Sequence, residues 1–398
     1  MKSLAVVVCL AAAAAVGQAD SLNCRQIGRC IVMGTARDAA RAGSFVYVAN
    51  DSRGLCIVNA VNPQSPFIAG NCSTPGLSYG VTTVDSLAYV ADMDGHLRII
   101  SVANPAEPHE VGSCSTPGWS YDVVVEDTLA LVADGAAGLS VINAAEAGSP
   151  FLVGNCLTGD TSYGVVLADS LAYVTGWTGG LHIISVANPA EPYEVGFCPG
   201  PDSAHGIAKA GDFVYVANGL SGLRIIDVSN PDSAHEVGYY DTPGEAWDVA
   251  VSDGLAYVAD GFSGLRVIDV SEPGNLHEVG HHDVAGNNCG VTVSGDTAYV
   301  TDSGARELRI IHYYGSSPGT KETQPARTRA SYPRPTMAGR MLTPGGQALA
   351  ELHDISGRRV MDLQPGENDV RALAPGVYFV TENGARCTVR SRKVVIQR

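Results

Sequence analysis

A repeat of 42 residues constrains this chain more than any other feature of its sequence. One aromatic or aliphatic position returns at that interval without an insertion or a deletion. The register positions are Tyr47, Tyr89, Leu131, Tyr173, Tyr215, Tyr257 and Tyr299. A fixed period of about 20 to 50 residues is typical of a solenoid, a propeller or a linear array. We therefore expect repeated copies of one small structural unit.

One copy, residues 79–120, divides into four short apolar runs, YGVTTV, LAYVAD, LRIISV and HEVGSC. Turn-forming pairs separate the runs: Asp85-Ser86, Asp94-Gly95 and Asn104-Pro105. Runs this short that are rich in Val, Ile, Tyr and Thr predict strands, and the helical period of about 3.6 residues is absent. Four antiparallel strands in a unit of about 40 to 45 residues form a propeller blade. Residues 20–314 are therefore predicted to form an all-β, seven-bladed β-propeller.

The two ends of the repeat region predict how the ring closes. The last copy, around Tyr299, supplies three strands and stops. The segment CRQIGRCIV (24–32) precedes the first copy, and Cys30 lies 42 residues before Cys72, in register with a fourth strand. An unpaired sheet edge at the ring junction would invite aggregation. We therefore expect the N-terminal strand within 24–32 to complete the last blade against 307–314.

The charge of the chain limits its partners. A net charge of −16 argues against nucleic acid or an anionic membrane as the partner. The charge is also uneven, because residues 321–398 have 13 Lys and Arg against 7 Asp and Glu, whereas residues 1–320 have 12 against 34. An acidic body thus precedes a basic tail.

The segments outside the repeats have recognisable compositions. Residues 1–19 have the pattern of a secretory signal peptide, with Lys2, an apolar run and a small-residue cleavage site ending at Ala19. The run is about 13 residues, too short for a membrane span of roughly 20, and no other segment could span. Residues 315–335 are rich in Ser, Thr, Pro and basic residues and predict a flexible linker. Residues 336–398 have short alternating runs between turns, which predicts a small β-sandwich.

Two stretches resemble known families. LRIIDVSNP (223–231) and LRVIDVSEP (265–273), the second after an ADGxxGL turn, resemble the LVIVD-repeat propellers of bacterial surface and secreted proteins. This resemblance implies a fold, but no single activity belongs to that family. LHDISGRRV (352–360), APGVYFV (374–380) and RKVVIQR (392–398) resemble the C-terminal sorting domain of type IX secretion substrates.

The second resemblance implies a route and a place for the protein. The signal would take the chain across the inner membrane, and the type IX secretion machinery would take it across the outer membrane of a Gram-negative bacterium. The protein would then be secreted, extracellular or held at the outer-membrane surface. The alternative is a terminal accessory domain with no role in export.

Two motifs suggest metals, and the repeat register argues against both. HEVGH (277–281) matches the HExxH pattern, which holds zinc only on a helix. The register places it in a fourth strand, where His277 and His281 would lie about 13 Å apart. Asx residues follow most second strands and suggest calcium: Asn50, Asp92, Asp134, Asn218, Asp260 and Asp302. The closing Glu of a calcium loop is absent, so turn stabilisation is favoured, and no metal or cofactor is predicted.

Five cysteines share one repeat position: Cys30, Cys72, Cys114, Cys156 and Cys198. Equivalent positions on neighbouring blades lie beyond disulfide reach, which is about 7 Å between Cα atoms. Buried free thiols are therefore the favoured interpretation. One bridge stays open, between Cys56 in a third strand and Cys72 in the next, because export would permit oxidation.

One position at the start of the first strands varies while its neighbours do not. Around the ring it reads Arg37, Tyr79, Tyr121, Tyr163, His205, Trp247 and Cys289. Trp119 and Trp177 map to loops on the same face. A variable aromatic position on a repeated framework is typical of a binding surface, and Asp122, Asp248 and Asp260 nearby would suit a glycan or a peptide. The candidate ligand-binding residues are Tyr79, Trp119, Tyr121, Tyr163, Trp177, His205 and Trp247. The alternative is that these rings pack between blades and plug the channel.

The sequence leaves three functions to compare. Phosphate-loop and GxGxxG motifs are absent, and no catalytic residue is assigned. Tyr163 with His205, or Asp122 or Asp248, would be the acid–base groups of an enzyme. The favoured hypothesis is a secreted or cell-surface binding or adhesion module with a glycan or protein ligand. The alternatives are an extracellular polysaccharide hydrolase or lyase acting at the channel mouth, and a scaffold.

Overall fold

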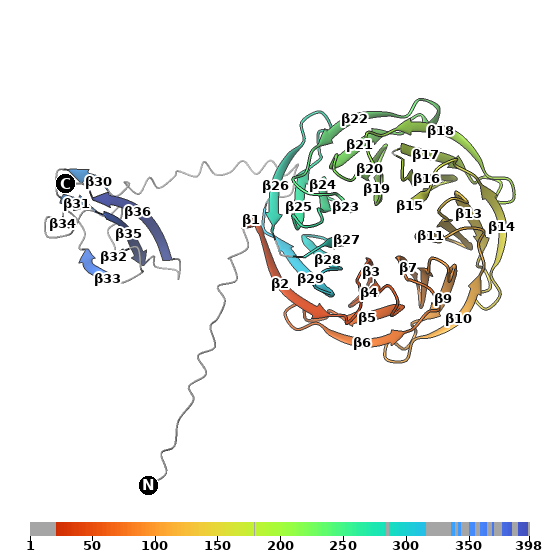
Figure 1. Ribbon diagram of the computed structural model, residues 1–398, viewed down its shortest axis with the longest axis horizontal. Coiled ribbons are helices and arrows are strands. Elements are labelled where there is room, and N and C mark those ends of the chain that lie inside the picture. The colour runs from red at the N-terminus through yellow and green to blue at the C-terminus, as the bar shows by residue number, and fades with distance from the viewer. Residues whose placement is uncertain are drawn as a thin grey trace, which may run out of the picture. The chain divides into compact units, whose positions relative to one another are not determined.

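Seven antiparallel sheets, six of four strands and one of five, stand around a central channel in the computed structural model of this chain (Figure 1). The structure describes residues 21–315 except 179 and 284–285, and the backbone of seven strands between 336 and 396. The chain divides into two units, 1–320 and 321–398. The predicted all-β, seven-bladed propeller is confirmed. No helix of the described residues is long and apolar enough to cross a membrane.

The blades are numbered here in chain order. Blade 1 contains β3 (Asp38–Ala42), β4 (Phe45–Ala49), β5 (Leu55–Asn59) and β6 (Phe67–Cys72). Blade 2 contains β7 (Gly80–Val84), β8 (Leu87–Ala91), β9 (Leu97–Ser101) and β10 (His109–Cys114). Blade 3 contains β11 (Asp122–Glu126), β12 (Leu129–Ala133), β13 (Leu139–Asn143) and β14 (Phe151–Cys156). Blade 4 contains β15 (Ser162–Ala168), β16 (Leu171–Gly176), β17 (Gly180–Ser185) and β18 (Tyr193–Pro199).

The remaining blades include the ring junction. Blade 5 contains β19 (Ile207–Ala210), β20 (Phe213–Ala217), β21 (Leu223–Asp227), the 3-10 turn η1 (Pro231–Ser233) and β22 (His235–Tyr240). Blade 6 contains β23 (Asp248–Ser252), β24 (Leu255–Ala259), β25 (Leu265–Asp269) and β26 (His277–His282). Blade 7 contains β27 (Asn288–Ser294), β28 (Thr297–Asp302), β29 (Glu307–Tyr313) and, from the N-terminus, β2 (Cys24–Ile31).

The core lies between neighbouring blades. Along β8, Ala88 and Val90 pack toward blade 1, whereas Tyr89 and Ala91 pack toward blade 3. Successive side chains of a strand point to opposite faces, so a strand buried on both faces reads as an uninterrupted apolar run. This explains the LAYVA-type sequence of every second strand. The register tyrosine belongs to this core, and Tyr257 is 1% exposed.

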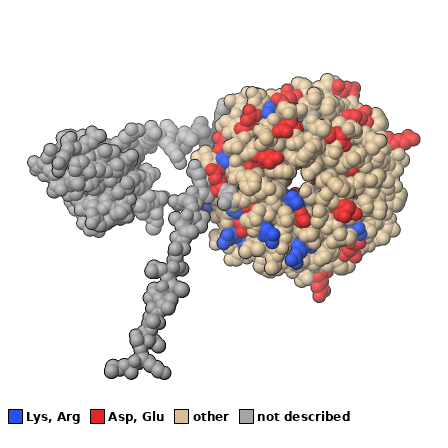
Figure 2. Space-filling view, in the orientation of Figure 1, with Lys and Arg blue, Asp and Glu red and all other residues tan. Residues whose placement is uncertain are grey.

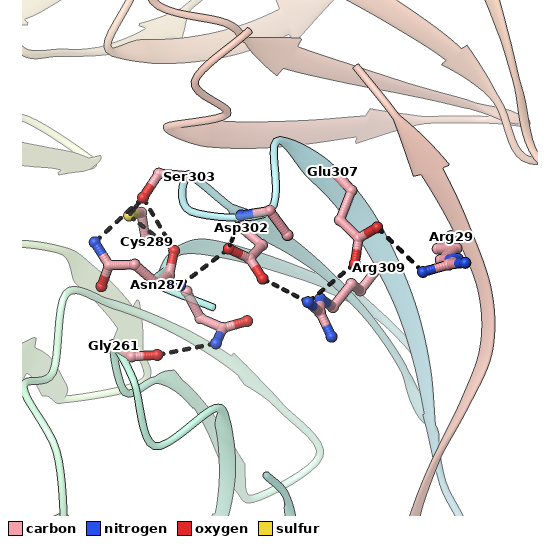
Figure 3. Close-up of polar contacts among 10 residues, drawn as sticks. Arg29, Gly261, Asn287, Cys289, Asp302, Ser303, Glu307 and Arg309 are labelled. Atoms are coloured by element: carbon pink, nitrogen blue, oxygen red, sulfur yellow. Dashed lines mark hydrogen bonds and ion pairs between the residues drawn. The ribbon is translucent and has the colours of Figure 1, made fainter. Parts of the chain in front are cut away.

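The ring closes as the sequence predicts. β2 pairs with β29 from Cys24 opposite Tyr313 to Ile31 opposite Glu307. Figure 3 shows ion pairs at this junction, where Arg29 of β2 lies 3.8 Å from the Glu307 carboxylate and Glu307 lies 2.9 Å from Arg309. The N-terminal strand therefore completes the last blade, and the prediction is confirmed.

A second N-terminal strand was not anticipated. β1 (Ser21–Leu22) pairs with β26 and gives blade 6 a fifth strand. In the other blades a fourth-strand glycine packs against the turn that joins the third and fourth strands of the next blade. At Gly70, for example, the Pro105 carbonyl leaves no room for a Cβ. Blade 7 has no such turn, and the Leu22 carbonyl takes its place, 3.0 Å from where a Cβ on Gly280 would lie.

The bridge between Cys56 and Cys72, left open from the sequence, does not form. Both cysteines are free. The register pairs Cys72 with Leu55 and Cys56 with Asn71. Because side chains alternate across a strand, a shift of one residue puts the two thiols on opposite faces of blade 1. Cys56 accordingly packs toward blade 7 and Cys72 toward blade 2.

The Asx residues after the second strands hold the loops that lead into their blades, and the Asp302 carboxylate also holds its own turn, because it accepts a hydrogen bond from Ala305 N at 2.8 Å. The Asp92 carboxylate accepts hydrogen bonds from Thr74 Oγ1 at 2.5 Å, Ser78 Oγ at 2.7 Å and Gly76 N at 2.8 Å. These donors lie in the loop that leads from blade 1 into blade 2. Protein donors thus occupy the carboxylate. The described residues contain no group of three or more His, Cys, Asp or Glu placed to hold a metal ion.

HEVGH lies in strand β26, as its register predicts. His281 Nδ1 lies 2.6 Å from Glu278 Oε1, and His277 lies 4.0 Å from Asp269. The two imidazoles therefore have separate carboxylate neighbours, and the arrangement differs from that of a helical zinc motif.

The C-terminal unit also consists of strands. One sheet has the order β30 (Thr336–Ala338), β31 (Met341–Thr343) and β34 (Asn368–Asp369). The other has the order β33 (Arg359–Leu363), β32 (Ala350–Asp354), β35 (Gly376–Asn383) and β36 (Val389–Ile396). The packing of these sheets as a sandwich stays a prediction. The predicted signal peptide (1–19) and most of the predicted linker (315–335) lie outside the described residues.

Candidate functional site

The variable residues at the starts of the first strands meet at one end of the channel. The turns between second and third strands and the loops between blades lie on this side, which we call the loop face. Figure 2 shows the ring hollowed at its centre, with acidic side chains spread around the visible face and most basic ones over blades 7 and 1. The candidate site occupies the channel mouth.

Aromatic side chains form a continuous arc around this mouth. The rings of Tyr79 and Tyr121 meet edge to face at 5.4 Å, and those of Tyr121 and Tyr163 stack at 4.4 Å. His205 continues the arc, 5.3 Å from Tyr163 and 4.4 Å from Trp247. These five residues are called the aromatic arc below. The structure thus brings five of the predicted site residues into one contact network.

Arg37 stands beside the arc in blade 1. Its guanidinium lies 4.6 Å from the centroid of the Tyr79 ring. The same group makes a salt bridge of 2.8 Å to Asp51. The arc therefore already contacts one cation, whose charge a neighbouring carboxylate balances.

The two remaining predicted residues are more exposed. Trp177 is 45% exposed and its ring lies 5.4 Å from Tyr163 and 5.3 Å from His205, so it extends the arc outward. Trp119 is 57% exposed, and within residues 21–315 no ring contact joins it to the arc. Its flanking residues are fixed, because Gly118 N and Ser120 Oγ donate to the Asp134 carboxylate at 2.9 and 3.3 Å.

The loop face exposes further apolar side chains that sequence reasoning missed, among them Met33, Leu77 and Leu157 in the loops between blades. Leu220 and Phe262 project from the turns between the second and third strands of blades 5 and 6, and Phe262 is 81% exposed. Their signal in the sequence was a large apolar residue inside a turn whose other residues are Gly, Ser and either Asn or Asp. Like Trp119 and Trp177, they are exposed apolar side chains around the channel mouth.

A cavity of about 130 Å³ lies at the channel mouth, lined by the arc and by three aspartates. They are Asp38, Asp122 and Asp248, each directly after the variable position of its first strand. The sequence analysis singled out Asp122 and Asp248 but missed Asp38. The other four blades have glycine there, and at Gly206 a Cβ would collide with the Asp248 carboxylate. Packing at the axis thus requires glycine beside each of these aspartates. This pattern of Asp and Gly at one repeat position could have been recognised by aligning the repeats.

Each of these carboxylates joins two blades. Asp38 accepts from Val81 N of blade 2 at 2.9 Å, and Asp122 accepts from Val165 N of blade 4 at 2.9 Å. Asp248 accepts from Val291 N of blade 7 at 2.8 Å. Each also accepts from the N–H of its own following residue.

Burial raises the pKa of all three groups. It raises the pKa of Asp38 to about 7, with a further contribution from the charge of Asp122. Burial also raises the pKa of Asp122, and it raises the pKa of Asp248 well above the ordinary carboxyl value, with help from Asp38. The carboxylates repel one another in a poorly solvated channel, which disfavours the fully ionised set.

His205 is neutral near pH 7. It is 2% exposed, and burial lowers its pKa to about 4. Its Nε2 lies 3.3 Å from Ser203 Oγ, and its Nδ1 has no hydrogen-bond partner. Burial moves the pKa of Tyr163 upward. Because both values move away from neutrality, the acid–base pair suggested by the sequence is poorly suited to proton transfer near pH 7.

Cys289 completes the ring of variable positions in blade 7. Its thiol lies 3.0 Å from Ser303 Oγ and 3.3 Å from the Asn287 carbonyl (Figure 3). Burial raises the pKa of the thiol. A thiol held in its protonated form is a weak nucleophile.

The sequence matches a known repeat, and the fold matches solved propellers. The model of the LVIVD repeat matches seven segments: residues 33–74, 79–116, 117–158, 161–199, 201–242, 243–284 and 285–311. No protein with a curated description matches the chain.

Two solved structures illustrate how general the fold is. The computationally designed Ika8 protein is similar at a TM-score of 0.52 and 6% identity, over 72% of this chain and 99% of that one. The WD40 β-propeller domain of Doa1 is similar at a TM-score of 0.58 and 12% identity, over 73% of this chain and 97% of that one. At such low identity these similarities show the fold alone.

Proposed function

This chain belongs to the LVIVD-repeat family of β-propellers, and we propose that it is a binding or adhesion module whose loop face holds a glycan or protein ligand. The observation that carries the proposal is the aromatic arc with two exposed tryptophans beside it. The repeated core needs none of these side chains, since its register residues already fill the space between blades.

Anchored loops prepare this face for binding. Trp119 sits between two residues bonded to Asp134. Trp177 N donates to the Thr161 carbonyl at 2.9 Å, and Thr178 beside it donates to Asp160 from its N–H and its hydroxyl at 3.0 and 2.8 Å. Rigid aromatic side chains lose little conformational entropy when a ligand binds. Such anchors stack on sugar rings or occupy the centre of protein interfaces.

The binding proposal has a direct test in the full chain. The wild-type chain is first screened for a ligand on a glycan array and on a cell surface. The double variant Trp119→Ala with Trp177→Ala should then no longer bind the glycan or protein that the wild-type chain binds. Tyr193→Ala is the matched control, because Tyr193 is 60% exposed on the outer strand β18 and away from the loop face. Equal loss in both variants, or no loss in the tryptophan variant, would reject the loop face as the binding surface.

We also propose that the protein is exported and secreted or held at the outer-membrane surface of a Gram-negative bacterium. The support is the signal-like segment 1–19 and the resemblance of 352–398 to type IX sorting domains. In a host with type IX secretion, a chain lacking 336–398 should accumulate in the periplasm, whereas the full chain reaches the medium or surface. Surface display of the truncated chain would refute the role of this segment.

The cavity carboxylates favour a second candidate function, that of a polysaccharide hydrolase or lyase. A carboxyl group whose pKa is about 7 suits a general acid at neutral pH. Two features support the binding function better. All three carboxylates already hold backbone N–H groups, and 130 Å³ is well below the roughly 300 to 1,000 Å³ of most ligand pockets. Release of reducing ends from a polysaccharide panel, lost in Asp122→Asn, would instead establish the enzyme.

A further inference from the structure

The cavity at the channel mouth combines two features that attract the same kind of ligand. The faces of aromatic rings carry partial negative charge and attract a cation whose centre lies within about 6 Å. The three aspartates add negative charge to the same cavity when they are ionised, and a cation bound beside them would favour their ionised forms. Neither feature alone defines a ligand, but together they favour a small organic cation.

Nothing in the described cavity neutralises these carboxylates. Within residues 21–315, Arg37 is the only Lys or Arg that lines the cavity, and it pairs with Asp51. The ion pairs found among these residues do not include Asp38, Asp122 or Asp248. A carboxylate has about four acceptor positions, and the backbone N–H groups use two on each aspartate. Acceptor capacity therefore remains for the N–H groups of an ammonium ion.

His205 supplies an independent sign of an unfilled site. It lines the same cavity, is 2% exposed, and has an Nδ1 atom without a partner. Buried polar atoms almost always have partners, so this atom requires an explanation. A neutral imidazole that donates through Nε2 to Ser203 would leave the buried Nδ1 as an acceptor, and it would not repel a cation.

The size of the cavity limits what enters it. A cavity of about 150 Å³ holds a molecule the size of benzene, so 130 Å³ admits the end of an alkylammonium group. A sugar chain or a folded segment does not fit. The rest of a larger ligand would lie on the loop face, beside Trp177 and Trp119.

We propose that this cavity binds an alkylammonium group, the head of a lysine side chain or of a small amine, between the aromatic arc and the three aspartates. The inference rests on the proposed binding function and names the chemistry of its central contact. Selectivity would be for a positive charge over a neutral group of equal size. Anions would be excluded by the same carboxylates.

The first experiment uses n-butylammonium and the full chain. Titration calorimetry should detect binding of n-butylammonium that is at least ten-fold tighter than binding of n-butanol, a neutral molecule of similar size. Equal affinity for the two would overturn the inference. This comparison uses the wild-type chain, so it does not depend on whether a variant folds.

Two variants of the same net charge then locate the site. Asp248→Asn removes a carboxyl group that a bound ammonium ion would hold in its ionised form, and it should weaken n-butylammonium binding at least ten-fold. Asp212→Asn, in an exposed turn of blade 5 between β19 and β20, removes the same charge elsewhere and should change the affinity less than two-fold. Equal effects of the two variants would indicate non-specific attraction and overturn the site. If Asp248→Asn does not fold, Tyr121→Leu provides the second variant, since it removes a ring face.

A third comparison tells whether the ammonium group belongs to a protein or to a free amine. It also distinguishes failure of this inference from failure of the proposed function. A peptide with one lysine should bind tighter than the same peptide with acetyl-lysine if the source is a protein. Equal, weak binding of both peptides beside tight n-butylammonium binding would assign a free amine. If loop-face binding persists while n-butylammonium does not bind, the inference fails and the proposed function stands. If n-butylammonium binds but Trp119→Ala and Trp177→Ala change no ligand binding, the proposed function fails.

Discussion

The second strands and the starts of the first strands lie a few residues apart in every blade, yet they behave differently around the ring. Second-strand positions repeat, because every blade packs against the same kind of neighbour. First-strand starts differ from blade to blade, because they face the axis, where they meet one another. The packing between blades is thus the same in all seven blades. At the channel mouth, by contrast, the seven different residues at the first-strand starts together form one site.

The comparison predicts that stability and binding depend on different residues. Tyr257→Ala should show the largest effect on stability, because this side chain is 1% exposed between blades 6 and 7. Truncating a buried aromatic residue typically costs about 3 to 5 kcal/mol. Urea unfolding measures the change, and a loss below about 1 kcal/mol would contradict the placement of this residue in the core.

Contacts between blades should give the next largest effect. Gly70→Ala places a Cβ against the Pro105 carbonyl, and overpacking costs about 1 to 3 kcal/mol. Gly274→Ala is the control, since a Cβ there meets nothing within 4 Å. The same unfolding assay should show little change for the control. Equal stability of both variants would mean that the glycine position does not fix the spacing of the blades.

The aspartates of the channel mouth should make stability depend on pH. Asp38 has a raised pKa of about 7, so its contribution is complete below the unfolded value of about 3.9 and is lost as the pH rises through 7. The titratable and charged groups that line its cavity are Arg37, Tyr79, Tyr121, Asp122, Tyr163, His205, Asp248 and Cys289.

Asp38→Asn should therefore reduce the fall in unfolding free energy between pH 5 and pH 8 by about 2 kcal/mol, because the folded and unfolded states differ by one proton over about two of these pH units and channel water screens part of the effect. Urea unfolding at the two pH values measures the difference. If the unfolding free energy of the variant falls with pH as steeply as that of the wild type, the Asp38 carboxyl group is solvated and its pKa is not raised.

The smallest effect on stability is expected on the loop face. Trp119→Ala should change the free energy of unfolding by no more than about 0.5 kcal/mol, because the side chain is 57% exposed. A larger loss would place Trp119 in the framework and weaken the division between framework and site.

Much of the framework was predictable because it repeats. The spacing of Tyr47 to Tyr299 determined the number of blades, and Cys30 in register with Cys72 identified the closing strand. The strand β1 was not predictable, because two residues carry no periodic pattern and their partner lies about 260 residues away in the chain. The one-residue register between Cys56 and Cys72 was also beyond the reach of spacing arguments.

The site was predictable in its members but not in its arrangement. The variable position identified Tyr79, Tyr121, Tyr163, His205 and Trp247, since each interrupts an otherwise repeated pattern. Sequence could not show that these rings contact one another, because that depends on the radius of the ring. The sequence analysis did not identify Asp38, although the Asp and Gly pattern of the repeats contains it, and its hydrogen bond to Val81 of the next blade is visible only in the structure.

The tryptophans provide the most direct test of the loop-face site. The chain has three, Trp119, Trp177 and Trp247, and all lie on the loop face. Their indole N–H resonances in an NMR spectrum therefore report on this face alone. The ligand is one that calorimetry has shown to bind. Its addition should shift the resonances of at least Trp177 and Trp247. If all three stay unchanged at saturation, the ligand binds elsewhere and the account of the loop face is wrong.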